Sequence, residues 1–209
     1  MSYKSLIQYI ELCHYGGIND FFLTPDSLVS LSELKIKFEG CSKCSFSSGQ
    51  NKFIFGDGKL GAKCFVIGDP PNDEESVIGY PFVGKIGELF DNLLNKLAIK
   101  RNELYITNIT KCKADNVSST NLQNCLPILN EQIDLLKPNI ILIFGLLAAN
   151  TFFMKNESLG YYRQNKNLEY DGIPVFVTYS LSELLENTSL RYPAWDDMQL
   201  FKKKWLSIN

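Results

Sequence analysis

Apolar residues along the chain alternate between short continuous runs and helix-spaced stripes from residue 64 onwards. The run Phe65-Val66-Ile67 predicts a buried strand, and apolar side chains at helical spacing over 86–97 predict an amphipathic helix after it. The same pattern returns further along. The expected strands are 64–67, 104–110, 139–144 and 175–178, and the helices after them are 86–97, 122–136, 146–153 and 196–206. This order predicts an α/β fold, a three-layer αβα sandwich with a mainly parallel central sheet of about four strands.

The chain before residue 64 has a less regular pattern. Helical spacing over 3–15 predicts a helix that ends at Gly16-Gly17, and a second helix is expected over 27–38. Residues 53–55 resemble a short edge strand before the turn Gly56-Asp57-Gly58. We therefore expect a single domain spanning 1–209, with 1–26 as a helical amino-terminal extension, although the length would also accommodate two small domains.

The composition excludes several classes of protein. With 45% hydrophobic residues, 21% charged residues and a net charge of −2, the chain is neither disordered nor an overall basic nucleic-acid binder. No apolar run reaches the roughly 20 residues that span a bilayer, and the first residues lack a signal-peptide pattern. We expect a cytoplasmic protein with reduced thiols and no membrane contact.

Six cysteines fall into two groups. Two occur in apolar patterns, where a free thiol acts as a small hydrophobic side chain; these are Cys13 and Cys64. The other four, Cys41, Cys44, Cys112 and Cys125, lie in polar surroundings, and the first two form a CxxC motif. Four thiolates suit either zinc or an iron–sulfur cluster, and the spacing does not separate these two. The alternative is four unconnected cysteines.

Polar and aromatic residues follow the first two expected strands, at the sheet edge where α/β folds bind ligands. Asp69 could act as a base, orient water or stabilise a cation, or it could form an Asx turn. The amide of Asn108 can both donate and accept, so it could pair with the N3–H and O4 edge of uracil or flip to suit other groups, or it could form a turn. Phe82 could stack on a planar ligand or fold back onto the core. Glu74 and Glu75 are expected to form a solvated loop face.

Four sequence motifs together resemble those of one protein family. They are Gly68-Asp69-Pro70-Pro71-Asn72, Gly79-Tyr80-Pro81-Phe82-Val83-Gly84, the run from Tyr105 to Cys112, and the run from Leu136 to Gly145. The family patterns are Gly-Glu-x-Pro-Gly, Gly-x-Pro-Phe-Val-Gly, Tyr-Ile-Thr-Asn-x-x-Lys-Cys and Leu-x-Pro-x-x-Ile-x-x-Leu-Gly. On these residues the chain resembles the uracil-DNA glycosylase superfamily, specifically its family 4, the iron–sulfur type of bacteria and archaea.

The resemblance implies a function and a set of site residues. A monomer would flip a uracil, or a related deaminated base, out of single- or double-stranded DNA and hydrolyse its N-glycosidic bond. Phe82 would stack under the base and Asn108 would read its pyrimidine edge, while Gly68, Pro71 and Asn72 would line the pocket. A [4Fe–4S] cluster, with zinc as the alternative, would be held by Cys41, Cys44, Cys112 and Cys125.

The departures from the family patterns include three at expected site residues. Asp69 stands where the family has Glu, and Asn72, which adopts left-handed backbone less readily, stands where it has Gly. Ser180 replaces the histidine of Thr-x-His-Pro-Ser, and the only histidine of the chain is His14. Loss of such a preorganised donor costs about 3–4 kcal/mol, or roughly 100- to 1000-fold in rate. The prediction is a weakened glycosylase that uses Asp69 and Ser180; the alternative is a catalytically silent protein that binds DNA or a protein partner.

DNA contact is expected from scattered basic residues, which would give weak, salt-dependent binding. Lys111 and Lys113 flank Cys112, and Lys43 lies inside the CxxC motif. The lysine triplet at 202–204 is read as a solvated helix face. The stretch 180–195, which includes Arg191, takes the place of the family's loop that enters the DNA minor groove.

Overall fold

The computed structural model describes residues 25–42, 52–113 and 118–208. The expected helix over 3–15 and nearly all of the expected extension 1–26 lie outside the described residues. The helices are α2 (Pro25–Glu39), α3 (Asp73–Ile78), α4 (Gly84–Leu97), η2 (Arg101–Glu103), α5 (Ser119–Leu136), α6 (Leu146–Phe153), α7 (Leu159–Gln164), α8 (Leu181–Glu186), η3 (Thr188–Leu190) and α9 (Arg191–Ser207). The strands are β1 (Asp57–Gly58), β2 (Cys64–Gly68), β3 (Leu104–Asn108), β4 (Ile140–Phe144), β5 (Glu169–Tyr170) and β6 (Ile173–Thr178).

The described residues form one sheet of six strands in the order β1-β3-β2-β4-β6-β5. The inner strands β3, β2, β4 and β6 are parallel, and β2 is buried along its whole length, as is typical of parallel strands covered on both faces. The chain starts this parallel set at β2, in the middle, and then builds outwards in both directions. Such a reversal leaves a crevice at the carboxyl ends of the strands, where α/β folds bind ligands.

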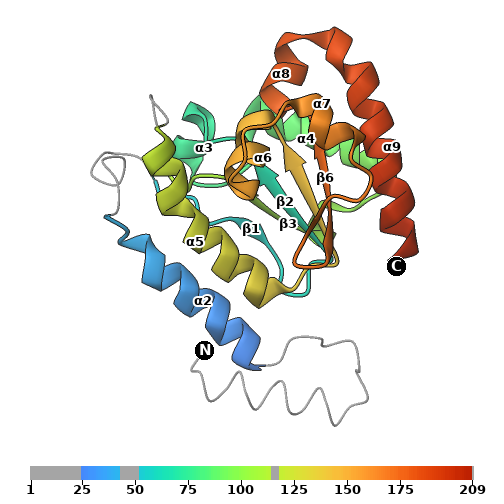
Figure 1. Ribbon diagram of the computed structural model, residues 1–209. Helices are drawn as coiled ribbons and strands as arrows, with labels where there is room; N and C mark the ends of the chain where they lie inside the picture. Colours follow the sequence, from blue (N-terminus) through green and yellow to red (C-terminus); the bar gives the residue numbers. More distant parts are fainter. Residues whose placement is uncertain (1–24, 43–51, 114–117, 209) are drawn as a thin grey trace.

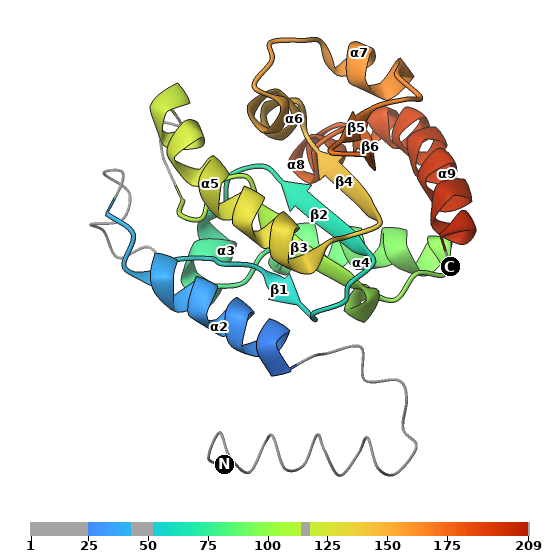
Figure 2. The ribbon, with the colours of Figure 1, turned by 60° about the horizontal axis from the view of Figure 1, so that its bottom comes forward.

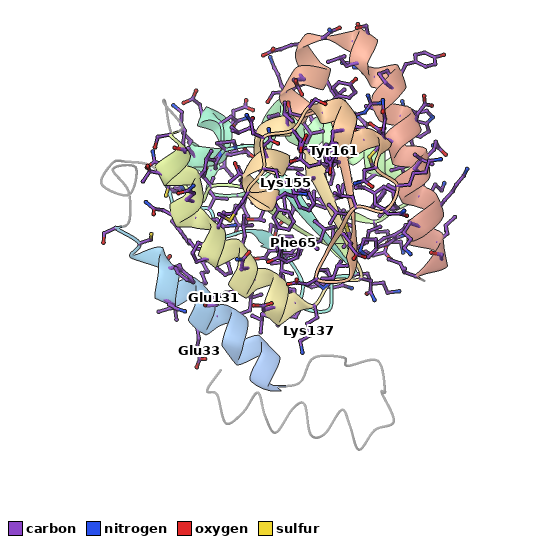
Figure 3. The ribbon with its side chains drawn as sticks, viewed as in Figure 1. Glu33, Phe65, Glu131, Lys137, Lys155 and Tyr161 are labelled. Atoms are coloured by element: carbon purple, nitrogen blue, oxygen red, sulfur yellow. The ribbon has the colours of Figure 1, made fainter. Side chains whose placement is uncertain are left out.

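Helices cover both faces of the sheet, so the predicted three-layer αβα sandwich with a mainly parallel sheet is confirmed (Figure 1). The side chains of α5 and α6 form one hydrophobic core with β2, β4 and β6, and Phe65 lies within it (Figure 3). The helices α4, α8 and α9 form a second core on the opposite face (Figure 2). Helix α2 packs outside α5, where Lys37 pairs with Glu131 at 2.7 Å.

Two edge strands enlarge the sheet beyond the predicted four. β1 and β5 pair antiparallel with β3 and β6. Because β1 and β5 have only two residues each, no alternating pattern in the sequence can reveal them. The edge strand expected at 53–55 is wrong, and the expected turn at 56–58 contains β1 instead. Hydrogen bonds from side chains take the place of strand pairing at Phe55. Its carbonyl accepts from Thr107 Oγ1 at 3.1 Å and from Gln132 Nε2 at 2.8 Å.

The stretch 180–195 is mainly helical in the structure. Ser180 begins α8 with a capping box, and α9 begins at Arg191, five residues before the expected start at 196. Pro193 lies in the first turn of α9, where a missing N–H costs little. None of the helices in the described part of the chain combines the length and apolar character needed to cross a membrane.

Candidate active site

The ends of the parallel strands meet around one small cavity. In register, Gly68 of β2 lies opposite Asn108 of β3, and the amide of Gly145, after β4, donates to the carbonyl of Thr178 in β6 at 3.0 Å. The cavity measures about 30 Å³. Its walls are Gly68, Asp69, Pro70, Asn72, Glu75, Phe82, Ile86, Asn108, Phe144, Leu181 and Ser182. Of the site residues expected from the sequence, Pro71 and Ser180 are not part of this wall.

Asn108 presents an unpaired acceptor in this region. Its Nδ2 donates to the carbonyl of Asp69 at 2.9 Å and to Oε1 of Glu75 at 3.3 Å, which fixes the orientation of the amide. Its Oδ1 is buried and has no hydrogen-bond partner among the described residues. Leaving a buried acceptor unpaired costs about 1–3 kcal/mol, so this oxygen suits a ligand that brings its own N–H donor.

Glu75 was expected on a solvated loop face, and that prediction is wrong. Its side chain is only 2% exposed and accepts from the amide of Phe82 at 2.6 Å and from the amide of Asn72 at 2.8 Å. Because Asn72 caps α3, Glu75 falls at the third helical position and turns inward as the partner in a capping box. An Asn followed three residues later by Glu was the sequence signal. Glu74 is exposed, as expected.

The Asn at position 72 causes no backbone strain. Its φ is −86° and its ψ is −175°, so the backbone is extended and does not require the glycine that the family has there. The Asn72 side chain instead accepts from the amide of Glu75 at 2.8 Å. This departure from the family pattern therefore supplies a helix cap.

Hydrogen bonds at both its N–H and its carbonyl fix the backbone of Phe82. Its φ is 53°, its N–H donates to Glu75, and its carbonyl accepts from Nη2 of Arg101 at 3.1 Å. The ring is 3% exposed and lies edge-to-face with Phe90 and Phe144, with centroids 4.9 and 6.1 Å away. A Cβ atom at Gly68 would lie 2.3 Å from this ring. Phe82 therefore packs on the core and lines the cavity at once.

The carboxylate of Asp69 points towards the junction of β4 and α6. A Cβ atom at Gly145, whose φ is +105°, would lie 2.4 Å from Oδ1 of Asp69. That oxygen is buried and has no hydrogen-bond partner in the described part of the chain. Burial, followed by repulsion from Glu183, raises the pKa of Asp69 to about 6, although hydrogen bonds from Ala148 and Ser180 lower it. The group therefore changes charge near neutral pH.

Ser180 is a buried neighbour of Asp69. It is 4% exposed, its Oγ accepts from the amide of Glu183 at 3.1 Å, and its own amide donates to Oε2 of Glu183 at 2.8 Å. Its hydroxyl donates to the Asp69 carboxylate, which stabilises the charged form of that group. Ser180 thus caps α8 and positions Asp69, and its expected role as a donor to the substrate stays a prediction.

We expect Ser180→Ala to change both stability and titration. Loss of the cap should lower the free energy of unfolding by about 1 kcal/mol. Loss of the hydroxyl should raise the pKa of Asp69 further, because that hydrogen bond favours the charged form. Denaturant unfolding and NMR titration of the Asp69 carboxyl measure the two effects.

Ser158→Ala is the matched control, because Ser158 caps α7 through the amide of Tyr161 at 3.1 Å and does not line the cavity. It should cost similar stability and leave the Asp69 titration unchanged. An unchanged Asp69 pKa in Ser180→Ala would contradict the positioning role.

Two of the four cysteines expected to bind a cofactor line a cavity that shares no residue with the candidate active site. Cys41, just after α2, and Cys112, after β3, line one cavity of about 400 Å³. Cys125 is buried on α5 and its charge acts on Lys111, the neighbour of Cys112 in sequence. Cys44 lies outside the described residues, and in the described part of the chain no three metal-ligating side chains form a group. The thiols of Cys41 and Cys112, from two separate segments, thus border one cavity, and Cys125 interacts with the residue before Cys112.

Lys111 is not available to DNA, which corrects the expectation from sequence. It is fully buried, and its Nζ donates to Thr107 Oγ1 and to Gln132 Oε1, the latter at 2.9 Å. Burial lowers the pKa of Lys111 to about 7. Lys113 forms an ion pair with Asp73 at 2.5 Å. Lys43 lies outside the described residues, while exposed Lys203 and Lys204 on α9 fit the expected solvated helix face.

Comparison with known proteins identifies relatives over most of the chain. The profile of the Uracil DNA glycosylase superfamily matches residues 55–205. The type-4 uracil-DNA glycosylase of Saccharolobus solfataricus is 31% identical over 174 residues, which cover 78% of this chain and 81% of that protein. The type-4 enzyme of Pyrobaculum aerophilum is 28% identical over 83% of this chain and 93% of its own length. That of Thermotoga maritima is 29% identical over 86% and 95% respectively.

Proposed function

The chain belongs to the uracil DNA glycosylase superfamily, and on that premise we propose that it hydrolyses the N-glycosidic bond of a flipped-out uracil in DNA. A related deaminated base such as hypoxanthine or xanthine is the alternative substrate. The protein would act as a monomer on single- or double-stranded DNA. The residues for this role would come from the ends of the four parallel strands, where the candidate site lies.

The observation that carries this proposal is the pair of buried acceptors Asn108 Oδ1 and Asp69 Oδ1, neither of which has a partner among the described residues. Uracil carries an N3–H that Asn108 Oδ1 would accept, while the ring of Phe82 would lie against the base. These contacts would offset the few kcal/mol that flipping costs. The cavity of about 30 Å³ holds about one water, so its walls must move apart to admit a base.

Asp69 would act on the sugar side of the bond. As the bond between C1′ and the base nitrogen breaks, its electron pair leaves with the base and positive charge develops on the sugar. The ionised carboxylate would stabilise that charge and accept a proton from the water that attacks C1′. The departing base anion takes up a proton from water, and the products are free uracil and an abasic site. Without the family's histidine, the leaving base loses one donor and the rate should be lower.

Release of uracil from an oligonucleotide tests the proposal directly. The expected result is slow release of free uracil from single- or double-stranded probes and none from a matched thymine probe. If no base is released at high protein concentration from uracil, hypoxanthine or xanthine probes, the proposed glycosylase activity is contradicted.

A second candidate function is DNA binding without catalysis. It is favoured by the placement of Ser180, whose hydroxyl donates to Asp69 where the family carries its catalytic histidine. Binding that is equal for probes with and without uracil, together with no base release, would support it. Preference for the uracil probe would support the glycosylase.

We also propose that Cys41, Cys44, Cys112 and Cys125 hold a [4Fe–4S] cluster, with zinc as the alternative. The cavity shared by Cys41 and Cys112 and the proximity of Cys125 to Lys111 support this assignment. Such a cluster supplies metal–thiolate bonds that cross-link separate segments. Here they would tie the end of α2 to the connection after β3 and to α5, on the side of the sheet away from α9.

Cys125→Ser should lower the bound iron and sulfide to well below those of the wild-type protein. Anaerobically purified wild-type protein should be brown, with broad visible absorption. Cys64→Ala is the matched control, because Cys64 is fully buried in β2 and outside the proposed ligand set. The iron content of this variant should equal that of the wild-type protein. Zinc in place of iron and sulfide would select the alternative, and wild-type iron and sulfide in Cys125→Ser would contradict the ligand assignment.

A further inference from the structure

A second cavity adjoins the active-site cavity on the α9 face of the sheet. It measures about 340 Å³, against about 30 Å³ for the active-site cavity, and lies between α4, α8 and α9. Phe144 and Leu181 line both cavities, so these two side chains form the wall between them. We call the larger one the α4–α9 groove. Its lining residues are Leu89, Asn92, Leu93, Lys96, Phe144, Thr178, Leu181, Leu184, Arg191, Tyr192, Ala194, Trp195 and Met198.

The groove combines an apolar floor with aromatic and cationic side chains. Leucines of α4 and α8 form the floor, and Tyr192 is 84% exposed. Nε of Arg191 donates to the carbonyl of Leu184 at 3.0 Å, which holds the guanidinium at the groove. Lys96 is a second cation in the lining, and no lining residue is acidic. Flat aromatic surfaces beside cations suit a ligand with a planar ring and a negative charge.

We propose that the α4–α9 groove is a subsite for the nucleotide next to the flipped one in single-stranded DNA, an inference that rests on the proposed function. The neighbouring base would stack on Tyr192 and Trp195, and its phosphate would lie at Arg191 and Lys96. Because the two cavities share Phe144 and Leu181 as a wall, a base in the groove would lie next to the flipped base. A base enters such a groove only when it is unpaired, so the subsite favours single strands.

The two tryptophans of the chain provide a direct measurement. Trp195 lines the groove, while Trp205 is 4% exposed and lies in the core. Titration of the intact protein with a short single-stranded thymidine oligonucleotide that contains no uracil should quench tryptophan emission to saturation. Trp195→Phe should abolish the quenching and leave the emission of Trp205. The same oligonucleotide annealed to its complement should quench less.

Tyr192→Ala should weaken binding of the oligonucleotide roughly 5- to 150-fold, the range expected for loss of one stacked base. Leu206→Ala is the matched control, because Leu206 is an exposed residue of α9 outside the groove lining and should leave affinity unchanged. Both positions are exposed, so neither change should prevent folding.

Uracil release by the same variants separates the two proposals. Release without quenching would overturn the subsite and leave the glycosylase standing. Quenching that depends on Tyr192, with no base release from any probe, would support the subsite and overturn the glycosylase. Unchanged affinity in Tyr192→Ala, or stronger quenching by the duplex than by the single strand, would overturn the subsite.

Discussion

Asp69→Asn is expected to lower uracil release by about a thousandfold, within the 100- to 10,000-fold range of a lost general base. Asparagine keeps the shape of the side chain but cannot accept a proton or stabilise the developing cation by charge. Single-turnover release from a uracil oligonucleotide measures the loss. Asp196→Asn, an exposed position in the first half of α9, is the control and should release uracil at the wild-type rate. Equal rates in the two variants would contradict the role of Asp69.

The pH profile sharpens this expectation. Burial and repulsion from Glu183 raise the pKa of Asp69 to about 6, and the proposed role requires the ionised form. The wild-type rate should therefore rise with pH through about 6 and level off above it. The residual rate of Asp69→Asn should lack this limb. A wild-type rate that is flat from pH 5 to pH 7 would contradict the assignment.

Stability should follow pH in the opposite sense. The folded protein holds the Asp69 proton up to a pKa of about 6, while the unfolded chain loses it near 3.8. Between these values the folded state binds more protons, so the free energy of unfolding falls as pH rises through this window. In Asp69→Asn this part of the decline should be absent. Urea unfolding at a series of pH values measures the difference.

Glu75→Ala is expected to lower the free energy of unfolding by about 3–5 kcal/mol, from several buried donors at about 1–3 kcal/mol each. The amides of Asn72 and Phe82 and the Nδ2 of Asn108 would all lose an acceptor. Asn108 and the loop of Phe82 would no longer be fixed, so uracil release should fall as well. Urea unfolding and the release assay measure these two effects.

Two comparison variants separate burial from charge at this position. Glu74→Ala, at an exposed neighbour, should change the free energy of unfolding by about 0.5 kcal/mol or less. Glu75→Gln retains one acceptor oxygen and should lie between wild type and Glu75→Ala. Equal stability of Glu74→Ala and Glu75→Ala would show that the buried carboxylate contributes little.

The parallel core was predictable because its strands are continuous apolar runs followed by helix-spaced stripes. The same runs placed Asp69 and Asn108 at strand ends, where the structure finds them together. Edge strands such as β1 are too short to carry a periodic signal. Glu75 was missed because an acidic residue in an acidic loop resembles a solvated one, and only the capping-box spacing from Asn72 indicated otherwise.

The burial of polar residues could not be predicted from the sequence for a different reason. Lys111 looked like a surface cation beside Cys112, but its partners are Thr107 on β3 and Gln132 on α5. Nothing local distinguishes a lysine that has such partners from a solvated one. The placement of Ser180 next to Asp69 likewise depends on the pairing of β6 with β4. These contacts join segments far apart in sequence, which short-range patterns do not record.

The arrangement of the site has a consequence for how its cavity forms during folding. Gly68 and Asn108 end β2 and β3, and Gly145 and Ser180 follow β4 and β6. None of these four strands is joined to the next one by a tight turn. Their meeting requires that all the crossover connections close, a slow, non-local step in folding. A partly folded chain would have helices but no assembled cavity. Recovery of base release after dilution from urea should therefore lag behind recovery of helical signal, and would time the completion of the sheet.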